Sequence, residues 1–203
     1  SNTAPKLSKM GGTSWENIKA KAKKEVELVA YDLLDLYAKR KIAQGIEFLP
    51  DTPWQNEMED NFEYTETIDQ MKAINDVKFD MEQQKPMDRL VCADVGFGKT
   101  EIALRAIFKA IMSGYQAAFI APTTILTMQH FETLKERFEP FNVEIGLLNR
   151  FCSKKEQKQL IEKINDGTLD VVVATHRLLS EDIKFKKLGL LVIDEENKFG
   201  VRH

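Results

Sequence analysis

The chain has 203 residues and is 43% hydrophobic, so it can bury one good core, and we expect one compact domain with an appendage. Its formal net charge of −3 argues against a generally basic nucleic-acid binder, and any contact with a phosphate backbone must come from a local patch. No apolar run approaches the roughly 20 residues of a membrane span and no signal segment opens the chain, so we expect a cytoplasmic protein with no membrane partner.

A long helix is predicted near the start of the chain. Residues 1–12 are polar, and Ser1-Asn2 is interpreted as a cloning remnant outside the fold. The capping box Thr13-Ser14-Trp15-Glu16 opens a helix, and apolar residues then recur every three to four positions until Gly45. This pattern predicts a helix over residues 13–45 that either lies on its own domain or connects the domain to an upstream region. Its length favours the connector, because most globular helices are far shorter.

Two shorter helices are predicted next. Thr52-Pro53 starts a short acidic helix, because proline suits the first helical position. Residues 62–67 form a loop, and the capping box Thr67-Ile68-Asp69-Gln70 opens a helix that reaches about Gln83. These helices precede the main pattern of the chain.

From residue 88, short apolar strands alternate with helices. Strands are predicted at about 88–93, 117–121, 143–148, 170–174 and 189–193, and helices at about 99–113, 124–138, 154–166 and 176–180. This alternation predicts an α/β fold with a parallel sheet covered by helices on both faces.

A phosphate-binding loop is predicted where the first of these strands meets its helix. Gly96-Phe97-Gly98-Lys99-Thr100 follows the strand and opens the helix, which is the context that such a loop needs. The glycines let backbone N–H groups turn toward a β-phosphate, Lys99 is suited to bridge the β- and γ-phosphates, and Thr100 offers a hydroxyl to Mg²⁺. The strict pattern has glycine where this chain has Ala93, a change that helicase-type loops accept. ATP and Mg²⁺ are therefore the predicted cofactors.

Two acids complete the predicted catalytic set. Asp194 and Glu195 follow the last strand, about 95 residues after the phosphate loop. An aspartate at a strand end can hold Mg²⁺, usually through water, and the adjacent glutamate can orient and deprotonate the attacking water. Adjacent acids alone are weak evidence, but together with the loop they indicate nucleotide hydrolysis by Lys99, Asp194 and Glu195.

Adenine recognition is a further hypothesis. Gln70 could read the edge of the base with its amide while Tyr64 or Phe62 packs on the ring. The alternative is a surface glutamine that only completes a capping box.

Three stretches with hydroxyl, amide or basic side chains follow predicted strands: "APTTILTMQH" (121–130), "NRF" (149–151) and "ATHRLL" (174–179). Such groups at helix starts are suited to grip nucleic-acid phosphates. Helix capping by Thr123, Thr124 and Thr175 is the alternative, and spacing alone does not choose between the two.

Several segments together resemble the bacterial transcription-repair coupling factors, a family of superfamily 2 double-stranded DNA translocases. They are "MDRLVCADVGFGKTEIALRA", "APTTILTMQHFETLKERF", "VVVATHRLL", "FKKLGLLVIDEENKFGVRH" and the upstream "LSKMGGTSWENIKAKAKKEVELVAYDLLDLYA". The resemblance runs from about Pro5 to His203. The RecG branch-migration helicases share much of this motor but usually have serine where Phe97 stands, and they lack the N-terminal helix sequence.

The resemblance implies an organisation and a function. Residues 46–203 would be the first RecA-like motor lobe, residues 13–45 a relay helix, and residues 1–12 would include the end of an upstream region that contacts RNA polymerase. The lobe would bind ATP in a translocase that displaces stalled RNA polymerase from double-stranded DNA and recruits nucleotide excision repair. A second RecA-like lobe would supply an arginine finger, worth about 10³ to 10⁵ in rate, so the fragment alone is expected to be nearly inactive.

The resemblance also assigns roles to residues that match the family's motifs. The nucleotide-binding residues are Phe62, Tyr64, Gln70, Ala93, Asp94, Val95, Gly96, Phe97, Gly98, Lys99, Thr100 and Glu101, of which Thr100 joins Asp194 at the metal. The DNA-binding residues are Pro122, Thr123, Thr124, Gln129, His130, Arg150, Phe151, Thr175, His176 and Arg177. Glu196 and Asn197 would couple the lobes, although Asn197 replaces the family's usual glutamine or histidine.

Two other functions stay open at this point. One is the motor lobe of a RecG-like branch-migration helicase. The other is an interaction module that senses nucleotide without hydrolysing it.

Overall fold

The computed structural model describes residues 44–92 and 98–194. The chain divides into two compact units, residues 1–44 and 45–203, and almost all of the described residues belong to the second. The predicted long helix lies outside the described residues except for Gln44 and Gly45, which are not helical. The stretch from Ala93 to Phe97 and the residues from Glu195 onward lie outside them as well.

Two capped helices open the described unit. Helix α2 (Pro53–Asp60) has Thr52 as its N-cap, whose hydroxyl accepts a hydrogen bond from the backbone N–H of Gln55 at 3.3 Å. Helix α3 (Ile68–Met81) begins with the predicted capping box, in which Thr67 and Gln70 bond each other's backbone N–H groups at 3.2 and 2.8 Å. Both predicted helix starts are confirmed, because they depend on local capping chemistry alone.

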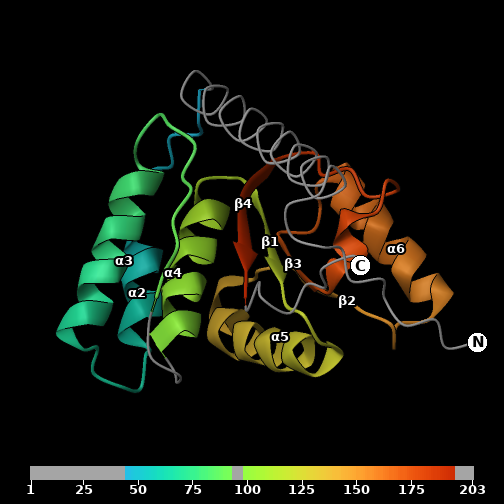
Figure 1. Ribbon diagram of the computed structural model, residues 1–203, viewed down its shortest axis with the longest axis horizontal. Coiled ribbons are helices and arrows are strands. Elements are labelled where there is room, and N and C mark those ends of the chain that lie inside the picture. The colour runs from blue at the N-terminus through green and yellow to red at the C-terminus, as the bar shows by residue number, and fades with distance from the viewer. Residues whose placement is uncertain (1–43, 93–97, 195–203) are drawn as a thin grey trace, which may run out of the picture. The chain divides into compact units, whose positions relative to one another are not determined.

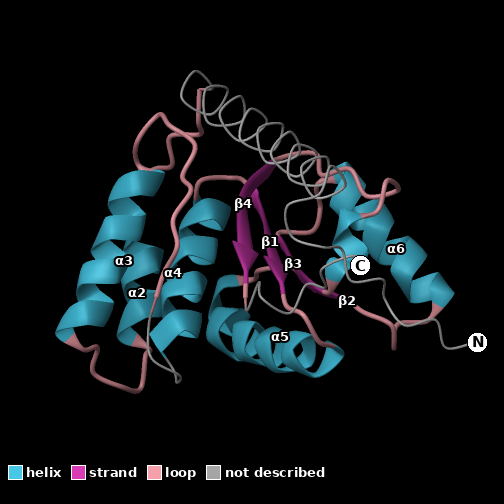
Figure 2. Cartoon of the chain, in the orientation of Figure 1, coloured by secondary structure: helices cyan, strands magenta, loops and turns pink. Residues whose placement is uncertain are grey.

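A parallel four-stranded sheet forms the centre of the unit (Figure 2). Its strands are β1 (Gln116–Ile120), β2 (Ile145–Leu148), β3 (Val171–Ala174) and β4 (Leu188–Ile193). Their spatial order is β2-β3-β1-β4, and each neighbouring pair is parallel. The predicted α/β class is therefore confirmed.

Successive residues of β1 and β3 enter two separate cores. Ala117 and Phe119 of β1 face the core that contains helices of one side, whereas Ala118 and Ile120 face the core of the other side. The first side carries α4 (Gly98–Met112) and α5 (Thr124–Phe138), and the second carries α6 (Lys154–Asp166) and the 3₁₀ helix η2 (His176–Leu179). Helices thus cover both faces, and α2 and α3 pack outside α4 (Figure 1).

The predicted strand at 88–93 is wrong over its described part, because residues 88–92 form no strand. Arg89 explains the difference: its Nε bonds Oδ2 of Asp80 at 2.6 Å, and its Nη1 lies 3.6 Å from Asp76, both on α3. These ion pairs hold the segment beside α3 (Figure 1) and leave Leu90 84% exposed. The apolar pattern located the segment but not this polar attachment.

Candidate nucleotide site and nucleic-acid edge

Lys99, Thr100 and Asp194 line one cavity of about 720 Å³. The first two residues lie in the first turn of α4, and Asp194 follows the last residue of β4. Helix α4 begins at the edge of the sheet where β4 ends (Figure 1). The carboxyl edge of a parallel sheet is where α/β proteins bind ligands, so the predicted phosphate-binding and metal-binding side chains share a suitable site.

Gln70 lies against the end of the predicted phosphate loop. A β-carbon at Gly98 would come within 2.5 Å of Nε2 of Gln70, so a side chain at position 98 would displace this amide. The Oε1 atom of Gln70 meanwhile accepts the backbone N–H of Thr67. The glutamine therefore completes its capping box and also touches the nucleotide site, which makes the two sequence interpretations compatible.

Phe62 and Tyr64 lie in the loop of residues 62–67, just before α3, and their surroundings differ. Phe62 is half-buried, and the guanidinium carbons of Arg105 and Arg137 lie 5.8 and 5.4 Å from its ring centre. Tyr64 packs edge-on against Phe62 at 5.6 Å and keeps 55% of its surface exposed. Of the two, Tyr64 is the better placed to stack on a base, while Phe62 anchors the loop.

Glu101, predicted to contact nucleotide, is buried and held by two arginines. Its Oε1 accepts bonds from Nε of Arg105 at 2.8 Å and from Nη2 of Arg137 at 3.2 Å. Arg105 also bonds Glu66 in the loop that carries Tyr64. Burial alone would lower the pKa of Arg105, but its bonds to Glu101 and Glu66 raise the pKa above the ordinary value, and Arg105 in turn lowers the pKa of Glu66. Arg105 connects the loop of residues 62–67 to α4, and the sequence pattern did not predict this role.

Two hydrogen bonds to other described residues hold Asp194. Its backbone N–H donates to the carbonyl of Ile120 at 2.9 Å, which continues the sheet by one residue. Its Oδ2 lies 2.9 Å from Nε2 of His130, whose ring stacks on Phe119 with centres 4.4 Å apart. His130 was predicted to contact DNA, and the structure gives its buried ring these contacts on the nucleotide side.

The donors around Asp194 fit Mg²⁺. The ion prefers oxygen ligands and is usually held by one or two protein groups together with water and phosphate oxygens. Thr100 and Asp194 supply a hydroxyl and a carboxylate to the same cavity. In residues 44–92 and 98–194, no cluster of three or more His, Cys, Asp or Glu side chains could bind a metal alone.

The three predicted nucleic-acid segments follow the carboxyl ends of β1, β2 and β3, and therefore share an edge of the sheet. At the first, Thr123 caps α5 by accepting the N–H of Leu126 at 3.2 Å, and Thr124 is buried. At the third, Thr175 makes no side-chain cap bond. Pro122 is half-buried and Gln129 is exposed. Capping therefore accounts for Thr123 but not for Thr175.

The two arginines at this edge of the sheet differ in their side-chain partners. The guanidinium of Arg150 lies 5.2 Å from the ring centre of Phe151, which is 67% exposed, so the pair presents both charge and an aromatic surface. Arg177 instead makes a two-bond ion pair with Asp182, at 2.8 and 2.7 Å. His176 is exposed beside it. Arg150 is thus the more available cation.

Thr127 and Asn149 belong to the first and second predicted nucleic-acid segments, but neither was predicted to have a role of its own. Asn149 is buried, donates from Nδ2 to Oγ1 of Thr127 at 3.3 Å, and accepts the N–H of Phe151 at 2.9 Å. These bonds connect the loop of Arg150 to α5. An asparagine directly after a strand is a known turn signal, whereas a threonine inside a helix gives none.

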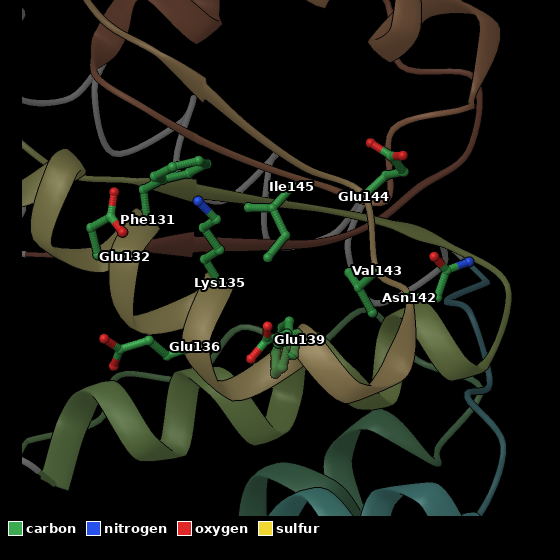
Figure 3. A pocket seen from close by; sticks show the side chains of 10 residues that line it. Phe131, Glu132, Lys135, Glu136, Glu139, Asn142, Val143, Glu144 and Ile145 are labelled. Carbon is green, nitrogen blue, oxygen red and sulfur yellow. The ribbon is translucent and has the colours of Figure 1, made fainter.

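A second hollow of about 520 Å³ lies between α5 and the start of β2 (Figure 3). Glu132 and Glu136 stand on α5 at one side, Glu144 stands at the other, and Lys135 lies between them. A predominantly acidic rim repels phosphate groups. This hollow is therefore a poor candidate for the nucleotide or nucleic-acid site.

Comparison with known proteins agrees with this geometry. Residues 67–203 match the DEAD/DEAH box helicase family. The chain belongs to this family. A fold of this family implies the use of ATP and usually of Mg²⁺, and places the chain among the helicase-superfamily ATPases in general. Among the described helices, none is long and apolar enough to cross a membrane.

Relatives confirm the resemblance to the transcription-repair coupling factors. The factor of Bacillus subtilis (strain 168) is 52% identical over 199 residues, and that of Staphylococcus aureus (strain USA300) is 53% identical over the same length. Each alignment covers 98% of this chain but 17% of the relative. The chain therefore spans about a sixth of the length of the curated relatives that it matches.

Solved structures confirm the RecA-like helicase fold. A structure of RecG bound to a three-way DNA junction matches with a TM-score of 0.75 and 34% identity, over 83% of this chain and 23% of that one. A hypothetical ATP-dependent RNA helicase from Sulfolobus tokodaii matches with a TM-score of 0.54 and 19% identity, over 72% and 42%. The second match concerns the fold alone.

Proposed function

We propose that residues 46–203 are the first motor lobe of an ATP-driven translocase on double-stranded DNA, with residues 13–45 as its connector. The whole protein would displace stalled RNA polymerase and recruit nucleotide excision repair in the bacterial cytoplasm. One observation carries the proposal: Lys99, Thr100 and Asp194 line a single cavity at the carboxyl edge of the sheet. The names of the relatives supply the biological role.

The side chains divide the work of nucleotide binding. Lys99 would neutralise the β- and γ-phosphates, and Gln70 with Tyr64 would hold the adenine beside the end of the loop. Thr100 and Asp194 would hold Mg²⁺, which when bound supplies positive charge against the phosphate oxygens. Glu195 would orient the attacking water and accept its proton.

The adjacent loops would grip the DNA backbone. Hydroxyls and backbone N–H groups at the start of α5 can bind phosphates, and the exposed pair of Arg150 and Phe151 adds charge and stacking. These loops share an edge of the sheet with the nucleotide site. A movement of the nucleotide site would therefore be transmitted to the loops that grip DNA. Such proximity is what a translocase requires.

Hydrolysis would be completed by an arginine from a second lobe, with Glu196 and Asn197 in the coupling between lobes. An arginine of this kind is worth about 10³ to 10⁵ in rate. We therefore expect the 203-residue chain to bind ATP weakly and to hydrolyse it negligibly. Steady-state turnover close to that of a two-lobed chain would contradict this expectation.

Nucleotide binding is the direct test. Titration of the 203-residue chain with a fluorescent ATP analogue and Mg²⁺ should give saturable binding that Lys99→Ala abolishes. Lys135→Ala is the matched control, because Lys135 is an exposed lysine beside the acidic hollow and away from the cavity. Equal affinity of the Lys99 and Lys135 variants would refute the nucleotide site.

The likeness to RecG favours a second candidate, a branch-migration helicase. A chain extended through the second lobe and its other domains would decide between them in two assays. Displacement of stalled RNA polymerase supports the first function, whereas migration of a branched junction without displacement supports the second. If Glu195→Gln leaves both activities intact in this extended chain, the protein senses nucleotide without using its hydrolysis.

A further inference from the structure

We propose that His130 is a positioning residue that orients the Asp194 carboxylate for the Mg²⁺-bound nucleotide. The inference deepens the proposed function and rests on it, because it takes Asp194 as the metal-side acid. It departs from the DNA contact expected for His130 from the sequence.

The geometry gives the histidine ring one well-defined partner. Nε2 of His130 lies 2.9 Å from Oδ2 of Asp194. An ionised carboxylate only accepts hydrogen bonds, so the neutral ring must carry its proton on Nε2 and donate it. His130 is 9% exposed and its ring stacks on Phe119 at an interplanar angle of 28°. Both the position and the rotation of the ring are therefore fixed by β1.

A fixed donor on one carboxylate oxygen also fixes the other oxygen. Asp194 is already attached through its backbone N–H to Ile120, so only the rotation of its side chain remains to be set. The bond from His130 sets that rotation and points Oδ1 in one direction. Outer-shell hydrogen bonds of this kind typically change metal affinity or activity by about 10- to 100-fold.

Simple packing is the competing explanation for a buried histidine on an amphipathic helix. It accounts for the stacking on Phe119, but it does not require a polar partner. The partner here is the acid that lines the same cavity as Lys99 and Thr100. A packing role predicts that an aromatic replacement is tolerated, whereas a positioning role predicts that it is not.

Helix α5, which carries His130, also contacts the predicted DNA edge. The helix follows its N-cap Thr123 beside the predicted DNA edge, and Thr127 bonds Asn149 of the neighbouring loop. His130 lies one further turn along and reaches the nucleotide side. A single rigid helix thus contacts both sites, and His130 is its contact with the predicted metal-side acid.

Two substitutions separate positioning from packing. His130→Phe keeps an aromatic ring on Phe119 but removes the donor, and His130→Gln keeps an amide N–H donor at about the reach of Nε2. The 203-residue chain would be titrated with a fluorescent ATP analogue, once in Mg²⁺ and once in EDTA. We expect His130→Phe to weaken binding about 10-fold in Mg²⁺ and to leave binding in EDTA unchanged, and His130→Gln to restore most of the loss.

The other possible outcomes of this titration would overturn either the positioning role of His130 or the proposed function. Unchanged affinity of His130→Phe in Mg²⁺, or an equal loss in Mg²⁺ and EDTA, overturns the positioning role. If thermal unfolding shows that His130→Phe does not fold, His130→Asn replaces it, because its shorter amide remains polar but does not reach Asp194. Failure of the unsubstituted chain to bind nucleotide, or full binding by Lys99→Ala, refutes the proposed function instead, and is thereby distinguished from failure of this inference.

Discussion

Helix α4 is buried from two sides by two different kinds of chemistry. Toward the sheet and α5 it presents apolar side chains such as Ile107 and Phe108, both fully buried. Toward α2 and the preceding loops it presents Glu101, Arg105 and Lys109, which are 5%, 2% and 1% exposed. Figure 1 shows α4 between these two layers. The same helix therefore depends on dispersion and hydrophobic burial on one side and on ion pairing on the other.

The two sides differ in how they tolerate change. Apolar packing loses free energy in proportion to the atoms removed. A buried ion, in contrast, has lost its hydration and depends on every partner, so removal of one partner leaves an uncompensated charge. Lys109 shows this dependence: its ammonium bonds Asp51, Glu82 and the carbonyl of Leu49.

The largest effect is expected from Arg105→Met. This change leaves Glu101 buried with Arg137 alone and removes the cation that Glu66 bonds, so the free energy of unfolding should fall by about 3 to 5 kcal/mol. Urea denaturation of the 203-residue chain measures the loss.

The matched control for that measurement is Arg177→Met. Arg177 forms a two-bond pair with Asp182, but both side chains are far more exposed, so the expected loss is about 0 to 1 kcal/mol. Similar losses in the two variants would show that the side of α4 facing α2 does not depend on buried charge.

This contrast separates what could be predicted from the sequence from what could not. The capping box at Thr67, the alternation of helices after residue 98 and four of the strands follow from local chemistry and apolar periodicity, and these are present, whereas the predicted box at Thr13 lies outside the described residues. Glu101, Arg105 and Lys109 recur every four residues, a spacing that ordinarily marks a solvated face of a helix. Their burial depends on α2 and the loop of Glu66, which periodicity cannot position.

The candidate site divides in the same way. Lys99, Thr100 and Asp194 could be grouped from motif spacing, and they share one cavity. The contact between His130 and Asp194 joins residues 64 positions apart and has no local signal. The attachment of Arg89 to α3, which replaces the predicted strand, spans only nine residues to Asp80, but it too is a side-chain pair between separate segments. Side-chain pairs between separate elements therefore could not be predicted from the sequence.

On the apolar side, a graded series at Ile107 should give graded losses. Ile107→Ala should lower the free energy of unfolding by about 2 to 5 kcal/mol and Ile107→Val by about 0.5 to 1.5 kcal/mol, because the first leaves a larger cavity. The same urea titration applies to both. A loss that did not increase with the number of carbons removed would contradict the description of this side as simple packing.

A smaller effect is expected at the start of α3. Thr67→Ala removes the hydroxyl that accepts the N–H of Gln70, at a cost of about 1 kcal/mol, whereas Thr67→Ser retains it and is the control. The Gln70 amide beside Gly98 is held by the backbone N–H of Thr67, which Thr67→Ala retains, so binding of the fluorescent ATP analogue should change little. A large loss of nucleotide affinity in Thr67→Ala would show that the hydroxyl of Thr67, and not its backbone N–H, positions the Gln70 amide.

The last prediction concerns the free energy of unfolding at low pH, which should change through the ion pairs of α4 and not through its apolar side. The bond to Arg105 lowers the pKa of Glu66 below its ordinary value of 4.5, so the unfolded chain binds more protons than the folded chain in the interval between the two pKa values. The stability due to this pair is therefore complete above pH 4.5 and is lost as the pH falls through the lowered folded pKa. In Arg105→Met the main cause of the lowered Glu66 pKa is gone, so most of this contribution should be absent at every pH. The difference in unfolding free energy between the unsubstituted chain and Arg105→Met, measured in urea from about pH 7 to about pH 3, should consequently narrow as the pH falls. The Ile107→Ala difference should stay nearly constant over the same range, since no proton is taken up on the apolar side of α4.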